Sequence, residues 1–120
     1  MKVLIVAHPD DEMLWFDPAW FDRIYIVFSG RPDKPDFKEK RQLAISEHPF
    51  SDKITLLNLE ESLYWKTGKN IDVFKSAKKQ LLEILLELKA LPLTEIFTHN
   101  QFGEYYHSDH ILINECVREV

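Results

Sequence analysis

The most constraining feature of the sequence is a short apolar segment that ends abruptly in polar residues. Residues 3–7 read Val-Leu-Ile-Val-Ala, and residues 8–12 continue with His-Pro-Asp-Asp-Glu. A continuous apolar run rich in β-branched residues is typical of a strand that is buried on both faces. Such strands occur almost only in parallel sheets with helices on both sides. We therefore expect an α/β fold whose first strand places residues 8–12 at one edge of the sheet.

Further strands and helices alternate along the rest of the chain. We predict strands over residues 23–28, 53–59 and 94–98. We predict helices over residues 10–15, from the N-cap Asp36 to just before His48, over 71–89 and over 109–120, with one extra turn at 18–21. Residues 99–106 are expected to form a loop. The clearest helix is 71–89, because its apolar residues recur at three- and four-residue spacing and predict a stripe that packs on the core. These residues are Phe74, Ala77, Leu81, Leu85 and Leu88.

The alternation of strands and helices predicts how the strands are arranged. Crossovers long enough to hold helices imply a mainly parallel sheet that is covered on both faces. Right-handed crossovers favour a Rossmann-like three-layer sandwich with strand order 3-2-1-4. In that order the first and fourth strands are neighbours at the topological switch point, where ligands bind beyond the carboxyl ends of strands. Residues 8–12 and 107–110, each of which follows one of these strands, should therefore meet.

Composition narrows the class of protein. The chain has 120 residues, which suits a single domain over 1–120. Its formal charge of −5 argues against nucleic acid or an anionic membrane surface as the main partner. Cys116 is the only cysteine, so an internal disulfide is excluded. The sequence contains neither a signal-peptide pattern nor an apolar stretch long enough for a membrane span, so a cytoplasmic protein is expected.

The two polar segments carry the residue types of a catalytic metal site. Such a site usually has three protein ligands and keeps one position open for water. His8 and Asp11 are three residues apart around the turn after the first strand, and His110 can supply the third ligand from the start of the last helix. Two imidazoles and one carboxylate suit Zn²⁺, although Fe²⁺ or another divalent transition metal also fits.

The residues beside these ligands suggest hydrolytic chemistry. Asp10 can act as general base on a water molecule that the metal activates. His107 can act as general acid, or stabilise a developing oxyanion when protonated. Asp109 can orient one of the two neighbouring histidines through its other ring nitrogen. Glu12 is expected to brace the turn rather than to take part in catalysis.

Each of these assignments has a structural alternative. The acids after Pro9 can simply begin a helix, and a single histidine is more often hydrogen-bonded in the interior than bound to a metal. The metal hypothesis is favoured because the segments meet at the ends of adjacent strands. His48 is expected at the surface, and His99 is left open as a pocket residue. The tryptophans are expected in the core or in the pocket wall; they are Trp15, Trp20 and Trp65.

The two motifs together resemble a known family. Val-Leu-Ile-Val-Ala-His-Pro-Asp-Asp-Glu (3–12) and Thr-His-Asn-Gln-Phe-Gly-Glu-Tyr-Tyr-His-Ser-Asp-His (98–110) are similar to the PIG-L/LmbE-like deacetylases, a family named for N-acetylglucosaminyl-phosphatidylinositol de-N-acetylase. The resemblance implies a Rossmann-like domain and zinc-dependent hydrolysis of an N-acetyl group, typically on a glucosamine derivative.

The resemblance also implies roles for individual residues. The implied zinc ligands are His8, Asp11 and His110. Asp10 matches the general base, and His107 matches the histidine that assists the tetrahedral intermediate and the leaving amine. Tyr105 matches a mobile pocket residue that reaches the substrate carbonyl oxygen. Arg41 aligns loosely with an arginine that contacts substrate.

The chain also departs from the family pattern. Family members continue with further strands after the His-x-Asp-His helix, whereas this chain stops within it, so we expect a domain shortened at its C-terminus. Its pocket is then shallow, or is completed by a second subunit of a homo-oligomer. The usual Gly-Gly-Thr segment is replaced by residues 15–20. Tyr106 and Ser108 stand where glycine and proline are common.

Two functional hypotheses of different classes follow. The first is a zinc-dependent hydrolase that removes acetyl from an N-acetylglucosamine-type sugar or a related small molecule. The second is a non-catalytic sugar- or metal-binding module derived from that family. A nucleotide-binding domain is disfavoured, because no Gly-x-Gly-x-x-Gly follows the first strand and the chain has only three glycines.

Overall fold

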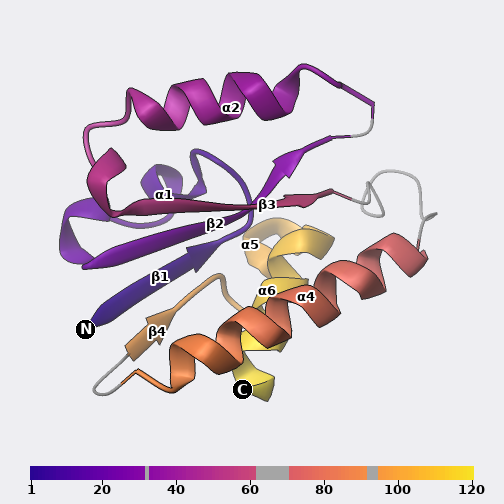
Figure 1. Ribbon diagram of the computed structural model, residues 1–120. Coiled ribbons are helices and arrows are strands. Elements are labelled where there is room, and N and C mark those ends of the chain that lie inside the picture. Colours follow the sequence, from indigo (N-terminus) through magenta and orange to yellow (C-terminus); the bar gives the residue numbers. More distant parts are fainter. Residues whose placement is uncertain (32, 62–70, 92–94) are drawn as a thin grey trace.

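Four parallel strands run through the centre of the protein, as Figure 1 shows for the computed structural model. The structure describes residues 1–31, 33–61, 71–91 and 95–120, without the side chains of 105 and 106. The strands are β1 (Lys2–Val6), β2 (Arg23–Gly30), β3 (Ile54–Glu60) and β4 (Glu95–Phe97). Their order is β3-β2-β1-β4 and every pairing is parallel, which confirms the predicted fold class.

Helices cover both faces of this sheet. They are α1 (Asp11–Leu14), η1 (Pro18–Trp20), α2 (Phe37–Ser46), η2 (Ser51–Lys53), α4 (Ile71–Lys89), α5 (Gly103–Tyr106) and α6 (Ser108–Glu119). In Figure 1, α2 lies on one side of the sheet, and α4 and α6 lie on the other. In the part of the chain that the structure describes, no helix combines the length and the apolar character that crossing a membrane requires.

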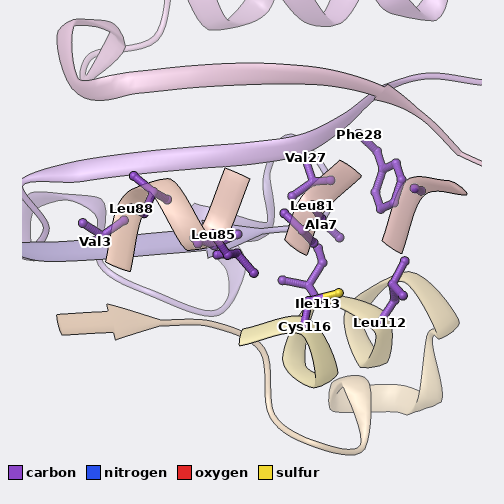
Figure 2. Packing of buried hydrophobic residues seen from close by; sticks show 12 residues of the cluster. Val3, Ala7, Val27, Phe28, Leu81, Leu85, Leu88, Leu112, Ile113 and Cys116 are labelled. Carbon is purple, nitrogen blue, oxygen red and sulfur yellow. The ribbon is translucent and has the colours of Figure 1, made fainter. Parts of the chain in front are cut away.

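The face of the sheet toward α4 and α6 carries the larger apolar cluster. Figure 2 shows side chains of β1, β2, α4 and α6 gathered in this layer. The predicted stripe of α4 is confirmed, because four of its five members are buried and the fifth packs against them; the buried ones are Ala77, Leu81, Leu85 and Leu88. Phe74 is the partly buried member.

The opposite face carries a second apolar cluster under α2 and η1. Leu4 and Val6 of β1 point to this side, while Val3 and Ile5 point to the first cluster, and none of the four is more than 1% exposed. The strand is therefore buried on both faces, as its continuous apolar run predicts.

The first helix, predicted over residues 10–15, is present as α1 over Asp11–Leu14. Two other local expectations are wrong. The loop predicted over residues 99–106 contains the short helix α5. Trp15 and Trp20 are 45% and 51% exposed, so they do not belong to the core, whose space smaller apolar side chains already fill. Trp20 instead packs its ring against Phe97 at the sheet edge. The third tryptophan, 65, lies outside the described residues.

Candidate metal centre

The candidate site lies at the carboxyl edge of the sheet, where β1 points toward α5 in Figure 1. The end of β1 supplies residues 8–11, and the end of β4 supplies His99. The end of β3 supplies Glu61, and the start of α6 supplies residues 107–110. Parallel strands end at one edge, so the topology alone brings together residues that are about a hundred positions apart in sequence.

The turn after β1 fixes the first two candidate ligands. The backbone N–H of Asp11 donates to the carbonyl oxygen of His8 at 3.2 Å, and the backbone N–H of His8 donates to Asp11 Oδ2 at 2.8 Å. Asp10 reverses the chain direction with a left-handed φ of 84°. An aspartate adopts this conformation more readily than most residues. The turn therefore aims His8 and Asp11 at the same point.

Three ligand atoms converge in a geometry that fits a metal ion. Asp11 Oδ2 lies 3.4 Å from His8 Nδ1 and 3.2 Å from His110 Nε2. The three side chains offer one ligand atom each within 4.8 Å of one another. Two atoms that bind one zinc ion tetrahedrally at about 2.1 Å lie roughly 3.4 Å apart. The predicted ligands are thus together, and both their chemistry and their spacing suit a divalent ion.

The electrostatics of these ligands favour a positive charge among them. Burial opposes the ionisation of Asp11, but contacts with His110 and His8 outweigh it and hold the pKa of this carboxyl well below its ordinary value. Burial also opposes a charge on His8, but contacts with the carboxylates of Asp109, Asp11 and Glu61 raise its pKa well above the ordinary value. A positive charge among these carboxylates, carried by a proton or by a divalent cation, is therefore favourable.

The outer nitrogen of His8 is held by two buried carboxylates. Its Nε2 lies 2.9 Å from Asp109 Oδ2 and 3.1 Å from Glu61 Oε1. Asp109 is fully buried, and the histidine that its carboxylate contacts is His8 of the first segment, whereas one of the neighbouring histidines, 107 or 110, was expected. The other oxygen of Glu61 accepts a hydrogen bond from Arg41 Nη1 at 2.9 Å. Arg41 thus acts on the site through Glu61.

Two further side chains, Glu104 and His99, contact His110. Glu104 Oε2 is 2.8 Å from Nδ1 of His110 and 3.1 Å from Nδ1 of His99. The two rings are stacked, with centroids 3.8 Å apart. The backbone N–H of Ala7 donates to His99 Nε2 at 3.0 Å, and burial lowers the pKa of His99 to about 4. His99 is therefore a neutral, interior residue that supports the site, and it lines neither of the two hollows described below.

His107 is the N-cap of α6. Its Nδ1 accepts a hydrogen bond from the backbone N–H of Asp109 at 3.1 Å, so the neutral ring carries its proton on Nε2. Burial, together with the nearby charge of His8, lowers the pKa of His107 to about 4. This side chain is thus suited to donate a hydrogen bond as a neutral ring, and less suited to act as a cationic acid.

A surface hollow of about 310 Å³ adjoins the ligand turn. It is lined by Pro9, Asp10, Phe37, Lys40, Arg41 and Ala44. Asp10 is exposed there and lies between the two ligands in sequence. The side chain of Tyr105 lies outside the described residues. A hollow of about 370 Å³ between α4 and α6 contains none of the site residues.

Comparisons of the chain with family models, with curated proteins and with solved structures give no match. The family resemblance of the two motifs therefore stays a prediction. What the site can do must be argued from its own geometry.

Glu12 and His48 form a buried pair next to the site. Glu12 is fully buried, and its Oε1 lies 3.2 Å from His48 Nε2. The expected surface position of His48 is wrong, because only 8% of its side chain is exposed. Burial raises the pKa of Glu12. The pair joins α1 to the loop after α2, and this is how Glu12 braces the turn.

Sequence reasoning missed Glu61 and Glu104. Neither stands at a spacing from His8 or His110 that is typical of a metal site. One signal was present for Glu61, since it directly follows β3 and must lie at the same edge as His8. Glu104 precedes His110 by six residues, and only the fold of the intervening turn brings the two together.

Proposed function

We propose that the chain is a metal-dependent hydrolase that removes an N-acetyl group from an N-acetylglucosamine-type sugar or a related small molecule. The observation that carries the proposal is the close approach of Asp11 Oδ2 to His8 Nδ1, at 3.4 Å, and to His110 Nε2, at 3.2 Å, beside an open hollow lined by Asp10. Two imidazoles and one carboxylate leave room for water, as in catalytic zinc sites.

His8, Asp11 and His110 would hold the ion, and Zn²⁺ fits this ligand set best. When bound, the ion polarises a carbonyl group and lowers the pKa of water toward neutrality. Asp109 and Glu61 keep His8 in place through its Nε2. Outer carboxylates of this kind fix the ring and raise the basicity of the ligand.

The remaining chemistry is carried by Asp10 and His107. Amide hydrolysis adds water across the C–N bond, so one proton leaves the attacking water and the departing amine gains one. Asp10 accepts the first proton and returns it to the amine nitrogen. The Nε2–H of His107 donates a hydrogen bond to the carbonyl oxygen as negative charge develops there. The products are acetate and the free amino sugar.

The test combines metal analysis with acetate release. Purified protein should contain about one equivalent of zinc and release acetate from a panel of N-acetylglucosamine derivatives, and a chelator should abolish the release. Asp10→Asn should retain the metal and lose at least about 100-fold in rate, the usual contribution of a general base. Asp52→Asn is the matched control, because Asp52 is exposed and precedes β3, at the opposite edge of the sheet.

The outcomes separate the two classes of function. Bound zinc without acetate release from any derivative would favour the non-catalytic binding module. Protein that binds no divalent ion would refute the hydrolase and a metal-binding module, and would leave only a sugar-binding module. A rate for Asp10→Asn equal to that of Asp52→Asn would remove Asp10 from the mechanism.

A further inference from the structure

We propose that Glu104 is a positioning residue, which holds the Nδ1–H of His110 and thereby directs the Nε2 lone pair of His110 toward Asp11. This inference rests on the proposed metal site and adds a residue to it. The family resemblance assigns no role to Glu104, and neither does the sequence pattern.

The contacts of Glu104 decide which nitrogen of His110 carries the proton. An ionised carboxylate oxygen only accepts hydrogen bonds. Glu104 Oε2 lies 2.8 Å from His110 Nδ1, so this nitrogen is the donor. In the neutral ring the lone pair is then on Nε2, the atom that lies 3.2 Å from Asp11 Oδ2. Removing the carboxylate removes the contact that selects this tautomer.

His99 strengthens the same arrangement. Its Nε2 accepts the backbone N–H of Ala7, so its proton is on Nδ1, which faces Glu104 Oε2 at 3.1 Å. The ring stacks on His110 at an angle of 17° and limits its rotation. The ligand atoms of His99, Glu104 and His110 also lie within 4.8 Å of one another. An ion held between them would require His99 to lose the proton on Nδ1 while Nε2 still accepts from Ala7, which is unfavourable. We therefore assign Glu104 to the support of the metal ligand.

The backbone around Glu104 is shaped to aim this side chain. Gly103 and Glu104 both have left-handed φ angles, of 64° and 61°. A left-handed conformation costs a residue with a Cβ roughly 1–2 kcal/mol, and such strain persists where the surroundings fix it. Asn100 stabilises this conformation through two hydrogen bonds. Its Oδ1 accepts one from the backbone N–H of Glu104 at 3.0 Å, and its backbone N–H donates one to Glu104 Oε1 at 3.0 Å.

Gly103 allows the turn to approach α6 closely. A Cβ on this residue would lie 2.9 Å from Ile111 Cγ1 and 3.2 Å from His110 Cβ. The turn thus lies directly against the first residues of α6, and both oxygens of Glu104 are engaged, one by Asn100 and one by the two histidines.

The first measurement is zinc affinity, by competition with a chromophoric chelator. Loss of an outer partner of a metal-bound histidine typically weakens metal binding by about 10–100-fold. Glu104→Ala should show a loss of this size. Glu104→Gln keeps an acceptor and should fall between wild type and Glu104→Ala. Glu115→Gln, an exposed acid on α6, should bind zinc within about twofold of wild type.

The second measurement is the histidine tautomer in the metal-free protein, by long-range ¹⁵N–¹H spectra at mildly alkaline pH. Wild type should show His110 and His99 protonated on Nδ1, and Glu104→Ala should lose this preference at His110. Circular dichroism establishes that each variant is folded, and Glu104→Gln serves if Glu104→Ala does not fold. Equal zinc affinities, or a wild-type His110 protonated on Nε2, would overturn the inference.

The same data separate this inference from the proposed function. Wild type that binds no zinc, but whose His110 tautomer depends on Glu104, would refute the metal centre and leave the positioning intact. Wild type that binds zinc with an affinity independent of Glu104 would support the metal centre and refute the positioning.

Discussion

Arg41 and Glu61 show how a single ion pair links α2 to the candidate site. The Arg41 guanidinium donates to Glu61 Oε2 at 2.9 Å and to the carbonyl oxygen of Ser29 at 3.3 Å. Only 3% of the Glu61 side chain is exposed. Burial opposes the charge on Glu61, but His8 and Arg41 outweigh burial and lower its pKa. The carboxylate therefore depends on Arg41 for compensation.

Replacing Arg41 should destabilise the protein by more than a surface pair would. In Arg41→Met the carboxylate of Glu61 stays buried without the guanidinium, and we expect a loss of about 2–3 kcal/mol in the free energy of unfolding. Urea unfolding measures it. Lys40→Met is the control, because the Lys40 side chain is 71% exposed and should cost no more than about 0.5 kcal/mol. Adding Glu61→Gln to Arg41→Met should recover stability, and a double variant no more stable than the single one would contradict this account.

The sequence predicted the candidate ligands but missed the residues that hold them in place. The reason for this difference is physical. His8, Asp11 and His110 stand in short polar segments beside predicted strand ends, so topology alone places them together. Glu104 reaches His110 only through two consecutive left-handed residues, and no periodic pattern indicates that turn. His48 looked like a surface residue because its partner, Glu12, is distant in sequence.

Helix α4 is the element that the sequence specified most completely. Its apolar residues alternate with charged ones at helical spacing, and the buried members face the sheet. Two adjacent leucines differ sharply, since Leu85 is fully buried and Leu86 is 58% exposed. The same side chain at neighbouring positions allows burial to be tested without a change of helix propensity.

Leu85→Ala should lower the free energy of unfolding by about 3 kcal/mol, because it removes buried carbons and leaves a cavity between α4 and the sheet. Leu86→Ala should cost less than about 0.5 kcal/mol, since exposed sites away from special features contribute little. Urea unfolding of both variants gives the comparison. Similar losses for the two leucines would mean that α4 does not present its predicted face to the sheet.

Short elements were harder to predict than long ones. The strands β1 and β2 lie where continuous apolar runs place them. Helix α5 has only four residues, too few to show a periodicity, and was expected as a loop. The helix predicted over residues 10–15 is present as α1, but the left-handed conformation of Asp10 just before it was not predicted. No sequence pattern indicates this conformation, because the contact between His8 and Asp11 across the turn stabilises it.

For the whole molecule, the decisive property is the strand order. Placing β1 between β2 and β4 brings the ends of strands from both halves of the chain to one edge. The sequence predicted this order from connection lengths and handedness alone. It did not predict that Glu61 and Glu104 would gather there too, because each of them comes from a separate part of the chain. The fold could thus be predicted from sequence patterns, whereas the set of acids at the site became known only from the structure.

Cys116 lies in the layer that α4 and α6 form against the sheet, so the ionisation of its thiol tests whether this layer excludes water. It is fully buried in the larger apolar cluster, and its Sγ lies 3.9 Å from the carbonyl oxygen of Lys78 on α4. Burial raises the pKa of this thiol to about 12. In the unfolded chain a cysteine ionises near pH 8.5, so the folded and unfolded states bind different numbers of protons above that pH.

The sign of the pH dependence follows from that difference. Between about pH 8.5 and 12 the folded protein keeps the proton on Cys116 while the unfolded chain loses it, so rising pH favours unfolding. The thiol should lower the free energy of unfolding by up to about 1.4 kcal/mol per pH unit in this range. Urea unfolding of wild type and Cys116→Ala at several alkaline pH values isolates this contribution, because lysines and tyrosines titrate in both proteins. The cavity in Cys116→Ala lowers stability at every pH but leaves the slope shallower than in wild type. Parallel curves for the two proteins would show that the thiol ionises as easily in the folded state, and that α4 and α6 do not close over it.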